Sequence, residues 1–408
     1  MVAVITAEPS EIVQVTRERL TLPRGAPDRW IRGAVLRRIQ TLGPGRGTPA
    51  PGAVDAASIT VSYRGSVLRV GKDYLVDPEW GSLGRPAGPC VAGPGRVAVS
   101  YRYALRRLDS WVGCDRGPDR IVKGVSHLTT PRPPAIREGQ RRIANIFIDY
   151  FSNGADADIF PVSEQPNQAG TRSTPGRLPA TMAKLGAGRP VRVVCWGDSV
   201  TEGGDATSPE AAYPALLRRR LQLKFPQARL EVQVVAVGAS NSRQWLYPNR
   251  FRHETRQGEC DWLRIARAQP DLVTIEFVND AGLSAAAFDE AYRDILGRLR
   301  AIGAEVVLIT PHFTWPPLMG FKGWRSPECR PYVRFLFKFA QEHRLAVADA
   351  SSRWAHLWKE GVPYITLLRN GINHPDDRGH AIFADELLKC FERYGLGPSS
   401  HRNKRKPS

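Results

Sequence analysis

The sequence predicts two successive regions: a β-rich, sandwich-like domain, and then a three-layer α/β/α domain built around a five-stranded parallel sheet. Short alternating runs separated by Gly and Pro clusters fill the first part of the chain. A stretch with few apolar clusters follows, and five apolar runs then alternate with helical patterns. We therefore expect a β-rich domain at 1–151, a linker at 152–190, an α/β/α domain at 191–395 and a basic tail at 396–408.

The N-terminal part has the pattern of short antiparallel strands. Ala57–Val70 places β-branched and aromatic residues around an Arg64-Gly65 turn, and Gly95–Leu105 and Arg141–Phe151 alternate apolar with polar or small residues. Gly- and Pro-rich stretches between these runs are typical of turns. Because this half contains no catalytic constellation, we expect it to be a structural or substrate-presenting module.

The region after residue 190 has the pattern of a parallel sheet covered by helices. Continuous apolar runs fit strands that are buried on both faces. The expected strands are Val191–Trp196, Glu231–Val237, Leu272–Phe277, Glu305–Thr310 and Leu345–Asp349. Apolar residues at helical spacing predict helices at Ala211–Phe225, Ser284–Ile302, Pro331–Arg344 and Gly379–Tyr394, with Ser284 as an N-cap. In such a domain the functional site lies at the carboxyl ends of the strands.

Composition and charge exclude several classes of protein. Hydrophobic residues are 42% and charged residues 24% of the chain, which is typical of a globular protein. No run approaches the ~20 apolar residues of a membrane span, and no signal peptide is readable, so we expect a cytoplasmic protein. The net charge of +18 raises the question of a nucleic-acid partner, but the basic residues are dispersed, so we expect none. The cysteines lie far apart without a CxxC pair and no HExxH occurs, so no metal and no cofactor are expected.

Polar residues follow several of the expected strands. Gly197-Asp198-Ser199 follows the first strand, where the free N–H groups of a new helix stabilise negative charge, although the tripeptide by itself favours a simple N-capping turn. Gly238 follows the second strand and Asn279 the third, and His374-Pro375 lies near the C-terminus. The absence of GxSxG argues against the nucleophile elbow of an α/β-hydrolase.

This ordered set resembles the SGNH (GDSL-type) hydrolase family over about residues 190–395. The resemblance implies a flavodoxin-like fold with Ser199 as the nucleophile and His374 as the general base. It also implies an oxyanion hole formed by the Ser199 N–H, Gly238 and Asn279. The chemistry is consistent, because a serine hydroxyl needs a base to take its proton and the resulting oxyanion needs hydrogen-bond donors.

Two positions depart from the family pattern. In the family, the motif that contains Asn279 normally begins with glycine. Here it begins with Phe277, so we expect a pocket of altered shape. Gly371 stands where the family usually has an aspartate three residues before the histidine. We therefore expect a Ser–His dyad in which Asn370, or a backbone carbonyl, orients His374.

Further polar residues and one long loop surround these motifs. Asp376 and Asp377 follow the histidine and are expected to cap the next helix, and His380 is expected on a helix face behind the site. The loop Thr310–Trp324 is rich in Trp, Phe and Pro and contains His312. It is expected beside the pocket, where its rings would either stack on a sugar or acyl group or simply pack over the sheet.

The sequence therefore predicts an ester hydrolase that removes a small acyl group, with acetyl as the leading case, through an acyl-Ser199 intermediate. A carbohydrate or related hydroxylated ester is the expected small-molecule or glycan partner, because the layout resembles that of some two-domain carbohydrate esterases. One alternative is a lipase- or thioesterase-type hydrolase with a broad apolar groove. The other is a non-catalytic glycan-binding protein with a decayed site, which only the missing acid supports.

Overall fold

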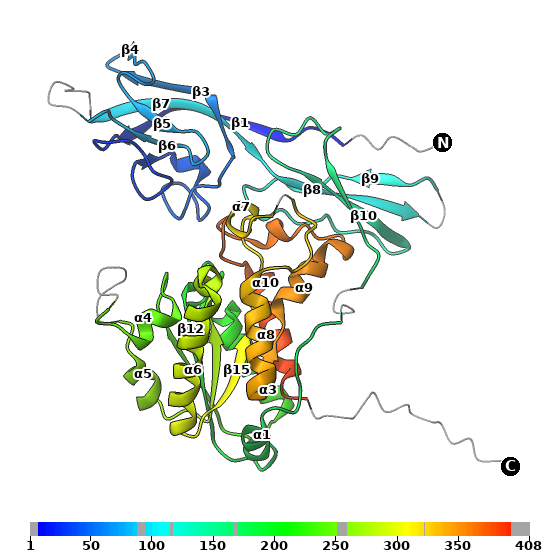
Figure 1. Cartoon of the computed structure of the whole chain (residues 1–408). Helices are drawn as coiled ribbons and strands as arrows, with labels where there is room; N and C mark the ends of the chain where they lie inside the picture. Colours follow the sequence, from blue (N-terminus) through cyan, green and yellow to red (C-terminus); the bar gives the residue numbers. More distant parts are fainter. Residues whose placement is uncertain are drawn as a thin grey trace.

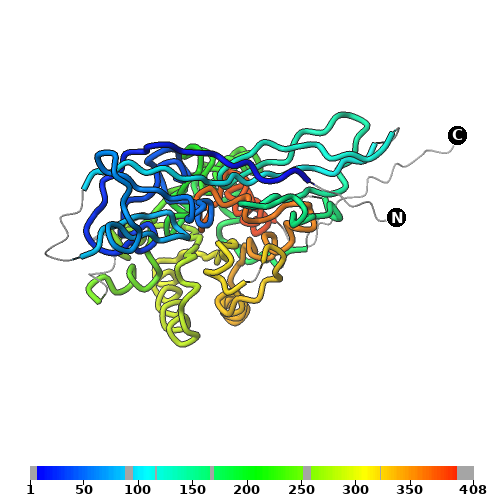
Figure 2. The backbone as a smooth tube through the Cα atoms, turned by 90° about the horizontal axis from the view of Figure 1, so that it is seen from above, coloured from blue at the N-terminus to red at the C-terminus, as the bar shows by residue number. Residues whose placement is uncertain are grey.

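The computed structural model describes residues 7–87, 95–114, 117–165, 170–250, 259–321 and 323–392, so the expected tail at 396–408 lies outside the described residues. A β-rich part lies across one end of an α/β part (Figure 1). Seen from above, the β-rich part is elongated and spans the width of the α/β part (Figure 2). None of the described helices combines the length and the apolar character that crossing a bilayer requires.

The α/β part contains the expected five-stranded parallel sheet, in the order β13-β12-β14-β15-β16. Its strands are β12 (Val191–Gly197), β13 (Leu230–Ala236), β14 (Leu272–Glu276), β15 (Glu305–Ile309) and β16 (Ala346–Ala348). Every residue of β14 is buried, and six of the seven in β12 are buried, which explains why these strands read as continuous apolar runs. The predicted α/β/α architecture is confirmed.

Helices cover both faces of this sheet. One face packs against α1 (Pro179–Gly186), α3 (Tyr213–Lys224) and α10 (Asp377–Lys389). The other packs against α4 (Ser242–Leu246), α5 (Trp262–Arg267), α6 (Ala285–Ala301) and α8 (Pro331–His343). The predicted N-cap Ser284 accepts a hydrogen bond from the Ala287 N–H at 3.2 Å, so α6 begins where the sequence predicted.

The N-terminal part is β-rich and antiparallel, as predicted. One sheet has the order β1-β7-β3-β4, formed by β1 (Glu11–Thr21), β7 (Arg96–Leu105), β3 (Val54–Tyr63) and β4 (Ser66–Val67). A second has the order β11-β10-β8-β9, formed by β11 (Asp158–Pro161), β10 (Gln140–Ile148), β8 (Arg107–Cys114) and β9 (Arg120–Val122). A small third sheet joins β2 (Ala34–Val35), β6 (Ser82–Gly84) and β5 (Leu75–Asp77). Only Arg106 separates β7 from β8, so the chain passes directly between the two larger sheets.

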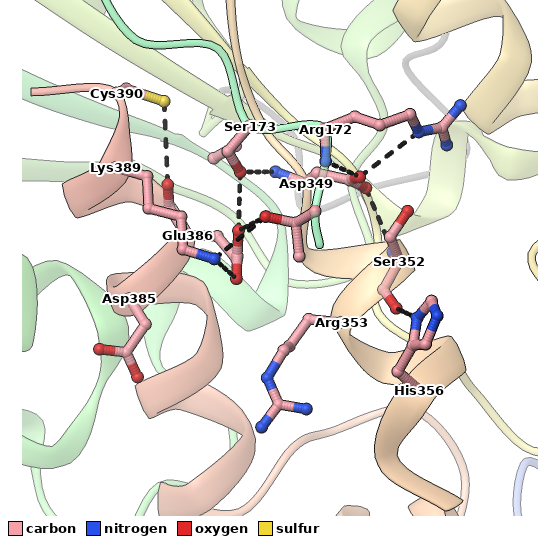
Figure 3. A network of polar contacts seen from close by, with 12 residues as sticks. Arg172, Ser173, Asp349, Ser352, Arg353, His356, Asp385, Glu386, Lys389 and Cys390 are labelled. Atoms are coloured by element: carbon pink, nitrogen blue, oxygen red, sulfur yellow. Dashed lines mark hydrogen bonds and ion pairs between the residues drawn. The ribbon is translucent and has the colours of Figure 1, made fainter. Parts of the chain in front are cut away.

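The segment expected as a loose linker is ordered where the structure describes it. It contains β11, which pairs with β10, and the helix α1. Between them, the Arg172 N–H donates to Asp349 at 2.8 Å and the Ser173 hydroxyl donates to Glu386 at 2.7 Å (Figure 3). Asp349 caps α9 (Ala350–His356) and Glu386 belongs to α10. The connection between the two parts is therefore anchored to the α/β part by side chains.

The two parts share a hydrophobic core. Leu108 and Phe160 of the β-rich part join Phe313 and Tyr364 of the α/β part in one buried cluster. The amide of Asn145, on β10, also donates to the Gly361 carbonyl at 2.6 Å across the same boundary. Because buried apolar contacts of this kind dominate stability, we expect the two parts to unfold together.

Truncating Leu108 tests this coupling. We expect Leu108→Ala to lower the free energy of unfolding by about 3 kcal/mol, because it leaves a cavity in the shared cluster. Tryptophan fluorescence and far-ultraviolet circular dichroism, followed during urea unfolding, should still report one transition. Leu22→Ala, which truncates a leucine buried within the β-rich part, is the matched control. A Leu108→Ala chain that loses β structure while its helices persist would contradict the shared core.

Candidate active site

Ser199 lies at the carboxyl end of the central strand β12. It is the first residue of the short helix α2 (Ser199–Glu202), and the preceding Asp198 caps that helix by accepting from the Val200 N–H at 3.1 Å. Gly197 is required here, because an added Cβ would lie 2.2 Å from the Glu276 carbonyl oxygen. The sequence Gly-Asp-Ser therefore places a serine hydroxyl just beyond the sheet, at a helix N-terminus.

His374 connects Ser199 to a carboxylate. Its Nε2 lies 2.9 Å from Ser199 Oγ and its Nδ1 lies 3.0 Å from Asp205 Oδ2. Since the Asp205 carboxylate accepts, Nδ1 carries the proton, which leaves Nε2 to accept from the Ser199 hydroxyl. The structure thus brings the two predicted residues together and forms a Ser–His–Asp chain. The expectation of a dyad without an orienting carboxylate is wrong.

The carboxylate does not stand three residues before the histidine, where the family pattern has it. Asp205 lies six positions after Ser199, and its backbone is left-handed, with a φ of 59°. Gly204 lets this turn pass the imidazole, since an added Cβ would lie 3.1 Å from His374 Nδ1 and 2.8 Å from the Ser199 carbonyl oxygen. Two glycines followed by an aspartate, shortly after the nucleophile motif, are the sequence signal that could have revealed it.

Asn370 does not orient the imidazole of His374, which corrects the second expectation. Its Oδ1 accepts from the backbone N–H groups of Ile372, Asn373 and His374, each at 2.9 Å. The short side chain is therefore used to shape the turn that carries His374. Asp205 holds the ring instead.

Of the two residues expected to complete the oxyanion hole, Gly238 lies next to Ser199, whereas the amide of Asn279 is bound elsewhere. Gly238 is adjacent, because a Cβ added to it would lie 3.7 Å from Ser199 Cβ. The Asn279 amide instead donates to Asp198 Oδ2 at 3.1 Å and to the Ser240 carbonyl at 3.0 Å. Asn279 is thus held beside the residue that precedes the serine, with both amide hydrogens engaged by the protein.

Phe277 lies in the core of the α/β part. Its side chain is buried, and its ring meets the Trp196 ring edge-on at 5.6 Å between centroids. Phe277 therefore adds to the core between the sheet and the helices.

Buried carboxyl groups lie beneath the serine. Burial raises the pKa of Asp198, and it raises the pKa of Glu276 well above its usual range. A neighbouring acid raises the pKa of each of these carboxyl groups further. Burial also raises the pKa of Asp280 to about 6, although the Ser242 N–H and the Tyr292 hydroxyl donate to it. The region around these carboxyl groups, next to Ser199, is therefore poorly solvated.

Two buried histidines support the turns on either side of His374. His312 Nε2–H donates to the Asn373 carbonyl at 2.6 Å, and burial lowers its pKa to about 3. His380 Nε2–H lies 3.4 Å from the Gly204 carbonyl oxygen, and burial lowers its pKa to about 4. Both imidazoles are therefore neutral, and His380 lies behind the site, as predicted.

The two aspartates after the histidine have different partners. Asp376 caps α10, as predicted, by accepting from the Arg378 and Gly379 N–H groups at 3.0 and 3.2 Å. Asp377 instead accepts from the Thr207 N–H at 2.9 Å and the Thr207 hydroxyl at 2.6 Å. Asp377 thus fixes the segment that follows Asp205, and its expected capping role is wrong.

A hollow of about 680 Å³ opens between the long loop and β11. The loop includes α7 (Pro316–Met319), and the Trp315 N–H donates to the Ile372 carbonyl at 2.6 Å, two residues before His374. Phe313, in contrast, is buried in the shared core. The loop therefore both packs and lines a cavity. The lining residues are Asp158, Phe160, Trp315, Pro316, Pro317, Phe321, Gly323, Trp324, Arg325 and Ser326. Across the described ranges, no three His, Cys, Asp or Glu side chains gather to hold a metal ion.

The neutral His380 predicts a specific pH dependence of stability. Its pKa falls from 6.5 to about 4 on folding, so the unfolded chain takes up a proton that the folded chain does not. This contribution to stability is present above pH 6.5 and is lost as the pH falls toward 4. Between pH 6.5 and about 4, the unfolding free energy of His380→Gln should therefore fall less steeply with decreasing pH than that of the wild type. We expect the two slopes to differ by about 1.4 kcal/mol per pH unit.

Urea unfolding at pH 7, 6 and 5 measures this difference, and effects of other titrating groups cancel between the two chains. His356→Gln, at a half-buried histidine of α9, controls for the loss of an imidazole. Parallel pH profiles for wild type and His380→Gln would contradict the neutral, buried state.

Comparison with known proteins identifies the α/β part. Residues 195–382 match the sequence profile of the GDSL-like Lipase/Acylhydrolase family. No curated protein is similar enough to count as a relative. Among solved structures, the chain is similar to a two-domain esterase (CEX) active on acetylated mannans, with 20% identity and a TM-score of 0.42 over 54% of this chain and 53% of that one.

It is also similar to an acetylxylan esterase from Geobacillus stearothermophilus, with 19% identity and a TM-score of 0.38 over 49% of this chain and 94% of that one. The first of these matches spans about half the length of the two-domain esterase. The match at residues 195–382 places the α/β part, and not the whole chain, in the GDSL-like Lipase/Acylhydrolase family.

Proposed function

We propose that this chain removes a small acyl group, acetyl in the leading case, from a carbohydrate or related hydroxylated ester. The observation that carries the catalytic part of the proposal is the contact of His374 with both Ser199 and Asp205. A serine hydroxyl becomes a nucleophile when a positioned base takes its proton, and the base needs a partner that fixes its tautomer.

The reaction would proceed through an acyl-enzyme. Ser199 Oγ attacks the ester carbonyl carbon while its proton moves to His374 Nε2, and Asp205 stabilises the resulting imidazolium. The tetrahedral intermediate then collapses, and His374 gives the proton to the departing alcohol oxygen. Water gives a proton to the same imidazole and attacks acyl-Ser199; the carboxylic acid leaves as the bond to Ser199 Oγ breaks, and His374 returns the proton to Ser199 Oγ.

The oxyanion would be stabilised by N–H groups beside the serine. The Ser199 N–H is at the first position of α2, where a helix offers no internal acceptor, and Gly238 lies against the serine. Each such donor is worth ~3 kcal/mol of transition-state stabilisation. Asn279 would join as a third donor only by exchanging one of its bonds to Asp198 and Ser240.

The hollow lined by Trp315, whose N–H donates to Ile372 in the turn that carries His374, supports a sugar over an acyl chain. Trp315 and Trp324 offer aromatic faces suited to a sugar ring, and Asp158 and Arg325 offer an acceptor and donors suited to its hydroxyl groups. A long acyl chain would be better served by a groove without charged groups. Asp205 also removes the support for a decayed, purely glycan-binding site, because that alternative rested on the missing acid.

Hydrolysis of p-nitrophenyl acetate tests the catalytic residues. We expect Ser199→Ala to lower kcat about 10³-fold or more, and Asp205→Asn to lower it by up to about 10⁴-fold, because an amide N–H that donates to Nδ1 favours the wrong tautomer of His374. Asp289→Asn, at an exposed ion pair on α6, should leave kcat unchanged. A Ser199→Ala chain as active as the wild type would refute the proposed mechanism.

Acyl preference and the hollow test the substrate class. We expect rates to fall from p-nitrophenyl acetate to butyrate to octanoate. On acetylated oligosaccharides, Trp315→Ala should raise KM about fivefold through lost stacking, with little change on p-nitrophenyl acetate. Preference for octanoate would favour the lipase- or thioesterase-type alternative, and an equal rise in KM on both substrates would rule out a sugar site at Trp315.

A further inference from the structure

The turn that carries His374 is held from outside the α/β part. The Thr129 hydroxyl donates to the Arg369 carbonyl at 2.9 Å, and the Thr48 hydroxyl donates to the next carbonyl, that of Asn370, at 3.4 Å. Both threonines belong to the β-rich part and lie more than 200 residues away in sequence. Two successive carbonyls of the turn are thus bound by hydroxyl groups from a different part of the fold.

Close packing accompanies these hydrogen bonds. Gly371 is left-handed, with a φ of 70°, and a Cβ added to it would lie 3.2 Å from Thr129 Cγ2 and 3.5 Å from Pro51 Cδ. Thr129 is completely buried, so its hydroxyl has no access to water. A buried hydroxyl whose acceptor moves away loses its hydrogen bond outright, and this holds the turn in one position.

The residues around Thr129 are fixed before they meet the turn. The Thr129 and Thr130 N–H groups donate to His127 Nδ1 at 3.0 and 2.9 Å. The backbone of His127 pairs with that of Arg106, whose guanidinium binds Asp149 at 2.7 Å. The segment 127–130 is therefore held in place by its own hydrogen bonds before it contacts the turn that carries His374.

The support is transmitted to the imidazole within the turn. The Arg369 N–H donates to the His374 carbonyl at 2.7 Å, and Asn370 Oδ1 accepts from the His374 N–H at 2.9 Å. The residues whose carbonyls the threonines bind are thus the ones that bind the His374 backbone. A displacement of about 1 Å at a catalytic group lowers rates by up to about 10²-fold.

We propose that Thr129, assisted by Thr48, is a positioning residue of the esterase site, so that the β-rich part completes the active site by fixing the His374 turn. This inference rests on the proposed function. It differs from a general role in holding the two parts together, because Asn145 crosses the same boundary through a buried bond to Gly361 and has no link to His374.

The test compares Thr129→Val, which removes only the hydroxyl, with Thr129→Ser, which retains it, in the full chain. We expect Thr129→Val to lower kcat for p-nitrophenyl acetate at least tenfold with KM within twofold of wild type. Thr129→Ser should restore most of kcat. Asn145→Ala, the matched control, should lower the melting temperature without lowering kcat.

Thr48→Val provides a second variant if Thr129→Val does not fold, with a smaller loss of about threefold in kcat because its bond is longer. The rate at which a fluorophosphonate labels Ser199 measures how reactive this serine is without an ester substrate. In these variants the labelling rate should fall together with kcat.

A folded Thr129→Val chain with wild-type kcat and labelling rate would overturn the inference while leaving the proposed function intact. An Asn145→Ala chain that loses as much kcat as Thr129→Val would overturn it as well. A wild type that neither hydrolyses esters nor labels at Ser199 would overturn both proposals together.

Discussion

The position of one imidazole between two oxygen atoms is the constraint on which the site depends. His374 Nδ1–H binds Asp205, and this leaves the Nε2 lone pair directed at Ser199. Ser199 and Asp205 both follow β12, whereas His374 lies far along the chain, on the turn that precedes α10. Gly197 and Gly204 serve this meeting, since a side chain at either position would collide with the backbone of the site.

Much of the α/β part could be predicted because its signals are local. Strands buried on both faces read as apolar runs, and Ser284 marks the start of α6 by its own side chain. The contact between Ser199 and His374 was anticipated through motifs that keep their order along the chain. These features depend on a few neighbouring residues, so they can be predicted without knowledge of the tertiary structure.

The features that were missed depend on long-range or conformational information. Asp205 contacts the imidazole from a left-handed turn, and the Gly-Gly-Asp sequence by itself does not fix the direction in which that turn points. The segment around Ser173 has the composition of a loose linker, rich in Gly, Pro, Ala and polar residues, yet Glu386 and Asp349 anchor it from far along the chain. Phe277 departs from the family's glycine, and its packing against Trp196 in the core depends on contacts that the sequence pattern does not show.

The core shared between the two parts limits how such a chain can change by recombination. Phe147 and Phe160 from one part, and Phe313 and Tyr364 from the other, cover each other. Exchanging the β-rich part for an unrelated module would uncover these rings and leave aromatic surface open to aggregation. The two parts are therefore expected to be inherited and to diverge as a pair, with substitutions on one side of the boundary matched on the other.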